Sequence, residues 1–121
     1  VYEDLEMLTI HVLDTTKGTP AKGVHIELYM VVNNHRLLIK KANTNCNGRC
    51  DQPLLSGDQI RIGTYELDFL VNDYFNVNNP TLKEPPFLST ITIRFGVSET
   101  NKHYHIPLLV SPYSYSTYRG S

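Results

Sequence analysis

The chain has 121 residues, and its 11 lysines and arginines nearly balance its 12 aspartates and glutamates, which gives a formal net charge of −1. This length is typical of one domain, and the balanced charge provides no basic patch for nucleic acid or for an anionic membrane. No apolar run approaches the roughly 20 residues that span a bilayer. We therefore expect neither nucleic acid nor a membrane as a partner.

The first residues differ in character from the rest of the chain. Residues 1–6 read Val-Tyr-Glu-Asp-Leu-Glu, which is acidic and lacks the charged and then apolar pattern of a signal peptide. The sequence does not begin with Met, which is compatible with a processed or excised fragment, and the sequence alone does not tell whether the chain was once part of a larger polypeptide. We predict that residues 1–7 form an N-terminal lead-in and that residues 8–121 form one folded domain.

Alternating apolar and polar residues predict three strands in the first half of the chain. These strands cover residues 8–14, 24–32 and 36–43. The loop between the first two strands contains three glycine or proline breakers. Asn33-Asn34 supplies a turn between the second and third strands, so we predict a hairpin there.

The middle of the chain predicts one more strand and a short helix. Residues 63–72 alternate again, which is typical of a strand. Asn72 or Asp73 can cap a short helix that continues to about residue 79, where Pro80 stops it.

Three further strands are predicted at residues 88–95, 103–110 and 113–118, and a very short one at 51–54 after an Asn47-Gly48 turn. The total is seven to eight short strands with one short helix. This pattern predicts an all-β domain that folds as a two-sheet β-sandwich.

The two cysteines are predicted to remain unpaired. If Asn47-Gly48 is a two-residue hairpin turn, Cys46 lies across from Arg49, and Cys50 faces the opposite side of the hairpin. That offset disfavours a disulfide, and two ligands alone do not form a zinc site. Free thiols favour a reducing compartment, so we expect the cytoplasm, with the peroxisome as an alternative.

Two histidines lie on the outward faces of their predicted strands. His11 is opposite the apolar residues of strand 8–14, and His105 is opposite those of strand 103–110. Pro107 has no N–H to donate, so its strand should lie at an edge or be irregular there. The outer face of a sandwich contacts solvent or another subunit, so a site built there needs a second molecule as its wall.

These histidines and Arg49 form a candidate catalytic set. A neutral imidazole takes a proton from water near neutral pH. An arginine binds a flat, oxygen-rich anion through paired hydrogen bonds and stabilises the oxyanion that forms when water attacks a cyclic carbonyl. Each residue alone is also explained as an ordinary surface residue, and the combination of His11, Arg49 and His105 argues for hydrolysis without a nucleophilic side chain.

A metal site is the alternative use of the same histidines. His103 and His105 lie on one side of their strand, and His11 could complete a three-histidine zinc site. Arg49 nearby would repel a cation, and no carboxylate is placed to support the ligands. We therefore expect no metal and no organic cofactor.

Three stretches of the sequence carry a resemblance to a known family. They are Leu8-Thr9-Ile10-His11-Val12-Leu13-Asp14, Thr44-Asn45-Cys46-Asn47-Gly48-Arg49, and the run from His103-Tyr104-His105-Ile106-Pro107 to the terminal Tyr118-Arg119-Gly120-Ser121. With these residues the chain resembles, over nearly its whole length, the transthyretin-related proteins that act as 5-hydroxyisourate hydrolases. The terminal tetrapeptide is the most specific feature, because transthyretin itself shares the preceding Ser-Pro-Tyr-Ser-Tyr-Ser-Thr run and lacks this ending.

The resemblance implies a transthyretin-like β-sandwich that opens the ring of 5-hydroxyisourate in purine (urate) catabolism. It implies a homotetramer whose sites lie at the subunit interface. It also implies that His11, Arg49 and His105 are catalytic. The same pocket would be lined by substrate-binding residues from the end of the chain, namely Tyr118, Arg119, Gly120 and Ser121. The family's usual Asp in the middle turn is Asn47 here.

The alternative function is a transthyretin-like carrier that binds a small hydrophobic ligand in a channel between subunits. Such a channel is expected to have an apolar lining, with charges only at its mouth. His11, His105, Arg49 and Arg119 would make this lining polar and cationic, which suits an anionic purine-derived substrate. A plain structural sandwich is a third hypothesis, and it gives no reason for gathering these groups.

Overall fold

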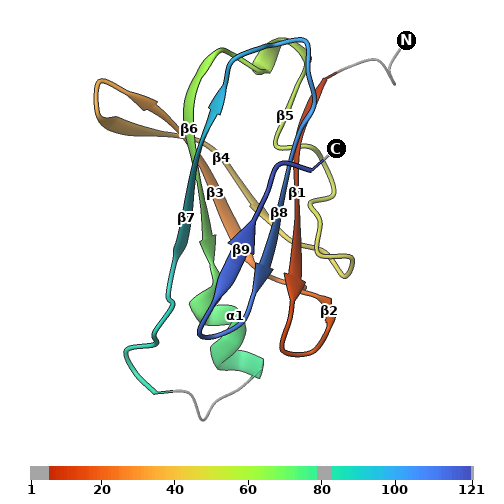
Figure 1. The fold of residues 1–121 in the computed structure, drawn as a ribbon, viewed down its shortest axis with the longest axis vertical. Helices are drawn as coiled ribbons and strands as arrows, with labels where there is room; N and C mark the ends of the chain where they lie inside the picture. Colours follow the sequence, from red (N-terminus) through yellow and green to blue (C-terminus); the bar gives the residue numbers. More distant parts are fainter. Residues whose placement is uncertain (1–5, 79–82, 121) are drawn as a thin grey trace.

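The structure, a computed structural model, describes residues 6–78 and 83–120. Two sheets pack face to face, and a helix lies at one end of them (Figure 1). In chain order the elements are β1 (Met7–Asp14), β2 (Thr19–Pro20), β3 (His25–Val32), β4 (His35–Asn43), β5 (Leu55–Ser56), the 3-10 helix η2 (Gly57–Gln59), β6 (Gly63–Leu70), α1 (Val71–Asn78), β7 (Ile91–Val97), β8 (Tyr104–Val110) and β9 (Tyr115–Thr117). The prediction of an all-β, two-sheet sandwich with one short helix is confirmed.

The two sheets differ in how their strands run. One sheet has the order β2-β1-β8-β9, with β5 also pairing with β1, and the other has the order β4-β3-β6-β7. β1 and β8 are parallel neighbours, whereas the other pairs are antiparallel. The parallel pair places Thr9 beside His105 and His11 beside Pro107. Residues from the two ends of the sequence therefore meet in the middle of one sheet.

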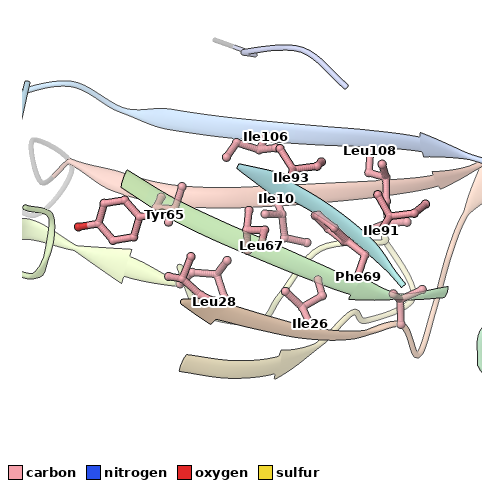
Figure 2. Close-up of a cluster of buried hydrophobic side chains, with 14 of the residues drawn as sticks. Ile10, Ile26, Leu28, Tyr65, Leu67, Phe69, Ile91, Ile93, Ile106 and Leu108 are labelled. Carbon is pink, nitrogen blue, oxygen red and sulfur yellow. The ribbon is translucent and has the colours of Figure 1, made fainter. Parts of the chain in front are cut away.

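The core lies between the sheets and is built from alternate residues of the long strands (Figure 2). In β1 the side chains of Leu8, Ile10 and Val12 are at most 2% exposed. In β8 the side chains of Ile106 and Leu108 are buried in the same way. Burying each such side chain contributes about 1.5–3 kcal/mol. Successive side chains of a strand point to opposite faces, so this burial turns the intervening residues of β1 and β8 outward.

The segment between β4 and β5 departs from the predicted hairpin. Asn45 and Gly48 close a turn, with the Gly48 N–H donating to the Asn45 carbonyl at 2.9 Å. The Gly48 carbonyl then accepts the Val12 N–H at 2.8 Å, so this loop attaches to β1. The very short strand predicted at 51–54 was misplaced, because pairing with β1 starts later, at Leu55. As predicted, Cys46 and Cys50 are free cysteines.

The other differences are small. The structure has nine strands within the described residues, because β2 and β5 are two-residue pairings that carry no periodic pattern. The helix begins at Val71, so the predicted caps Asn72 and Asp73 lie inside its first turn. Val1–Leu5 of the predicted lead-in, Pro80 and Ser121 lie outside the described residues. Within the described ranges, no helix is long and apolar enough to cross a membrane.

Pro107 does not lie at a sheet edge, because β8 has β1 on one side and β9 on the other. The ladder with β9 is nevertheless irregular at this residue, as predicted. The paired residues run from Val110 with Tyr115 to Leu108 with Thr117. Pairing resumes in the same register where His105 lies opposite Gly120. The interruption covers Ile106 and Pro107, and Pro107 has no N–H to contribute to the ladder.

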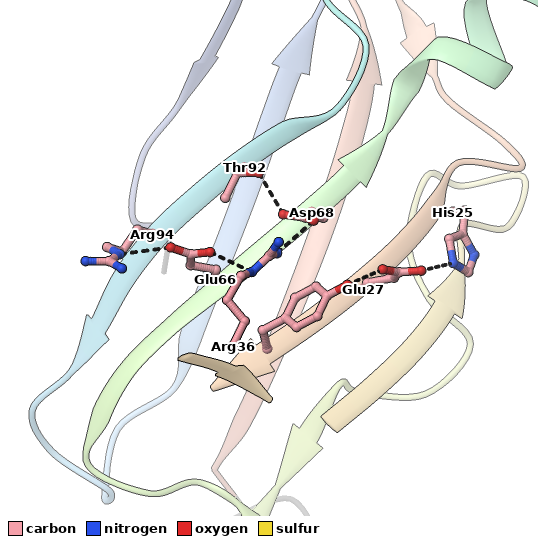
Figure 3. Close-up of polar contacts among 8 residues, drawn as sticks. His25, Glu27, Arg36, Glu66, Asp68, Thr92 and Arg94 are labelled. Atoms are coloured by element: carbon pink, nitrogen blue, oxygen red, sulfur yellow. Dashed lines mark hydrogen bonds and ion pairs between the residues drawn. The ribbon is translucent and has the colours of Figure 1, made fainter. Parts of the chain in front are cut away.

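The outer face of the second sheet carries a network of charged residues (Figure 3). Arg36 of β4 extends over the Tyr29 ring and binds Glu66 at 2.9 Å and Asp68 at 2.7 Å, both on β6. Arg94 of β7 binds Glu66 from the other side at 2.9 Å. Opposite charges thus pair across the strands of this sheet.

Candidate functional site

The candidate site lies on the outer face of the β1–β8 pair. His11 and His105 point outward from these neighbouring strands, and each ring is half-buried. In the β1–β8 register, His105 pairs with Thr9, and His11 lies two residues further along β1. Neighbouring strands are about 5 Å apart, and two residues along a strand span about 7 Å. The structure therefore brings together two histidines that are 94 positions apart in sequence (105 minus 11).

Arg49 reaches this face because the loop before it is fixed to β1. Gly48 has a φ of +73°, a conformation that favours glycine. A Cβ at this position would lie 2.4 Å from the Val12 carbonyl oxygen and 3.3 Å from Cδ2 of His11. Only a residue without a side chain allows so close an approach. The Gly48–Val12 hydrogen bond then places the next residue, Arg49, beside the histidines.

The His105 ring is held on two sides. Its Nδ1 lies 2.8 Å from Oγ1 of Thr9, within hydrogen-bonding distance. On the other side, the Gly120 N–H donates to the His105 carbonyl at 2.8 Å. A Cβ at Gly120 would lie 2.7 Å from Cδ2 of the ring. The end of the chain is therefore packed against this histidine.

Burial and charge both act on the two imidazoles. Partial burial lowers the pKa of His105, and the positive charges of Arg49 and His11 lower it further. Burial also lowers the pKa of His11, as does Arg49, while a hydrogen bond with the Asn47 backbone acts in the opposite direction. These shifts favour the neutral form of both rings, which is the state in which an imidazole accepts a proton.

A cavity of about 360 Å³ opens beside His105. It is lined by Met7, Thr9, Arg49, His103 and His105, which are all polar or basic except Met7. His103 accepts a hydrogen bond from the Met7 N–H at its Nδ1, over 3.2 Å. Among the residues that the structure describes, no three His, Cys, Asp or Glu side chains gather as metal ligands, so His11, His103 and His105 do not assemble the alternative zinc site.

The residues of the terminal tetrapeptide lie on two different sides of the sheet that contains β1 and β8. Gly120 contacts His105, as described above. Arg119 instead places its guanidinium 4.4 Å from the centre of the Tyr104 ring and donates to the His103 carbonyl at 3.1 Å. Tyr118 and Arg119 line a separate groove of about 270 Å³ between the edges of the two sheets. Within one chain, Arg119 is thus directed away from His11 and His105, and Ser121 lies outside the described residues.

Sequence reasoning did not single out Thr9 or the role of Gly48. Thr9 gives no sequence signal of its own, because threonine is common on the outward face of a strand. The Asn-Gly pair at 47–48 did indicate a turn, but the contact of Gly48 with Val12 depends on how the loop folds back on β1.

The fold and the site together define a transthyretin-like β-sandwich with a basic, histidine-containing site on its outer face. Residues 8–120 match the HIUase/Transthyretin family, and the chain belongs to this family. The resemblance noted in the sequence is thereby confirmed.

Three known proteins illustrate the range of this family. The 5-hydroxyisourate hydrolase of Ralstonia nicotianae is 55% identical over 94% of this chain and 97% of its own. A crystal structure of (S)-allantoin synthase matches with a TM-score of 0.90 and 42% identity over 97% of this chain, which spans only 44% of that protein. Sea bream transthyretin, solved in complex with thyroxine, matches with a TM-score of 0.83 and 28% identity over 93% of both chains.

Proposed function

We propose that this chain hydrolyses 5-hydroxyisourate, the reaction for which its relative from Ralstonia nicotianae is named. The observation that carries the proposal is the grouping of His11, Arg49 and His105 on one outer face, where a carrier of apolar ligands would have an apolar lining. A third hypothesis, a purely structural sandwich, gives no reason for this grouping.

The chemistry follows from the charges on this face. A neutral histidine takes a proton from water, and the resulting hydroxide adds to a ring carbonyl. Arg49 stabilises the negative charge that develops on the carbonyl oxygen. The ring C–N bond then breaks, and the protonated imidazole returns its proton to the leaving nitrogen. The new carboxylic acid loses its remaining proton to solvent and is released as a carboxylate. Arg49 supplies the positive charge that a metal provides in other hydrolases, so we expect turnover to survive dialysis against a strong chelator.

The working form is proposed to be a homotetramer. His11 and His105 lie on an outer face and need a wall from another subunit, and a two-fold interface would place the same patch on both partners. In such an assembly Tyr118, Arg119 and Ser121 of one chain could line a site completed by its neighbour. Light scattering that shows an active monomer would contradict this assembly. Location in the cytoplasm, or in the peroxisome, likewise remains a prediction.

The decisive experiment supplies freshly generated 5-hydroxyisourate and follows its ultraviolet decay with and without the protein. Decay that is faster than the spontaneous reaction and proportional to protein concentration is the expected result. Unchanged decay, together with saturable binding of an apolar ligand, would favour the carrier.

A further inference from the structure

Thr9 is the closest polar neighbour of the His105 ring among the contacts described above. The two residues are paired across the β1–β8 ladder, and Oγ1 of Thr9 lies 2.8 Å from Nδ1 of His105. Within the described part of the chain, this is the one hydrogen bond of the Thr9 hydroxyl. Thr9 also lines the cavity beside His105, together with Arg49.

We propose that Thr9 is a positioning residue that accepts a hydrogen bond from Nδ1–H of His105, and so leaves the lone pair of Nε2 free toward the cavity. This inference rests on the proposed function of the site. Which ring nitrogen of a neutral histidine carries the proton is set by the hydrogen bond that the other groups offer. A hydroxyl that accepts from Nδ1 makes Nε2 the basic nitrogen.

The surroundings of the ring support this assignment. Thr9 contacts Nδ1 of the ring, and the backbone of Gly120 packs against Cδ2. The two ring atoms bonded to Cγ are therefore both covered by other parts of the protein. The remaining ring nitrogen, Nε2, lies at the far end of the imidazole. A base at that position accepts the proton of a water molecule without moving its ring, which is the arrangement that general base catalysis requires.

The same hydrogen bond acts on the protonated form. When Nε2 takes a proton, the imidazolium still donates from Nδ1 to Thr9, and a hydrogen bond that stabilises the charged form raises a pKa. This effect opposes the two groups that lower the pKa of the ring, Arg49 from the loop and His11 from β1. His103, which comes just before β8, lines the same cavity. Removal of the hydroxyl should therefore make His105 harder to protonate and a weaker base.

The test compares Thr9→Val with Thr9→Ser. Valine keeps the shape of threonine and suits a strand, while serine keeps the hydroxyl. Thr92→Val is the matched control, because Thr92 also sits on a strand and bonds a side chain, Asp68, on the outer face of the other sheet. Each protein is assayed for kcat and KM across pH, and the ring nitrogens of His105 are observed by ¹⁵N NMR.

For Thr9→Val we expect kcat to fall by about 10-fold or more with KM within about 2-fold, the scale seen when a group that orients a functional histidine is lost. The acid limb of kcat/KM should move to lower pH, a shift that loss of structure alone would not produce. Thr9→Ser and Thr92→Val should both stay close to the parent. The ¹⁵N signals should show the proton on Nδ1 in the parent and a loss of this preference in Thr9→Val.

Two results would overturn the inference: an unchanged kcat and acid limb in Thr9→Val, or ¹⁵N signals that place the proton of the parent ring on Nε2. A parent protein without turnover would refute the proposed function instead. In that case the NMR titration of His105 still decides the role of Thr9, because it does not depend on substrate.

Discussion

Replacing Gly48 by alanine should detach the Arg49 loop from β1. The new Cβ would lie 2.4 Å from the Val12 carbonyl oxygen, which is backbone and cannot turn aside. Holding alanine at a φ of +73° costs about 1–2 kcal/mol. Loss of the 2.8 Å hydrogen bond from Val12 N–H to the Gly48 carbonyl costs about 1 kcal/mol more. The total is about 2–3 kcal/mol, which lowers the melting temperature of a domain of this size by about 8–12 °C.

Gly18→Ala provides the matched control. Gly18 has a φ of +71°, but no atom lies within 4 Å of its added Cβ. Alanine at this position suffers the backbone strain without the clash, so we expect a decrease in melting temperature of about 4–8 °C and full activity.

Calorimetry and the ultraviolet decay assay distinguish the two variants. Gly48→Ala should lose about 10²-fold or more in kcat/KM at a temperature where it is fully folded, because Arg49 is displaced from the anion that it stabilises. If Gly48→Ala and Gly18→Ala melt together and turn over equally fast, the loop does not need its contact with Val12 and the reasoning fails.

Three further predictions use the same assay. Alanine at His11, Arg49 or His105 should each reduce kcat/KM by about 10²-fold or more and change melting only slightly, because these are outer-face side chains; early melting with retained activity would make them structural. Arg49→Gln removes a charge that lowers the pKa of both histidines, so the acid limb of the residual kcat/KM should move to higher pH, and an unmoved limb would separate Arg49 from the base. Deletion of residues 119–121, or a tag fused after Ser121, should depress activity strongly by disturbing the Gly120 contact with His105, whereas an N-terminal tag should not; equal turnover from the two tagged forms would remove the tail from the site.

The strands and the two histidines could be predicted because alternation in a strand is a local property. In 8–14 and 103–110 the apolar residues occupy every second position, so the outward direction of His11 and His105 follows from the sequence. The route of the chain between 44 and 55 could not be predicted in this way. Its course depends on a hydrogen bond between Gly48 and Val12, which are 36 positions apart (48 minus 12).

The face of the sheet on which the Arg119 side chain lies also could not be predicted from the local sequence. The resemblance grouped the four terminal residues in one pocket, yet consecutive residues of an extended segment point to opposite faces. Gly120 pairs with His105 on the outer face, so Arg119 faces the other way and stacks on Tyr104. A site that includes both residues needs a contribution from a second chain, which one sequence read alone does not display.

The core of this sandwich determines where its chemistry can occur. Because the side-chain period of a strand is two, a slip of β1 by one residue would bury His11, a slip of β8 would bury His105, and either slip would expose the apolar residues of the strand that shifts. Burying unpaired polar rings costs several kcal/mol, so the inward Leu8, Ile10 and Val12 hold the outward histidines in place. The outer positions do not contribute to this packing and are free to differ between proteins of one fold. A catalytic face and a ligand-carrying face can therefore arise on the same sandwich through outer-face residues alone.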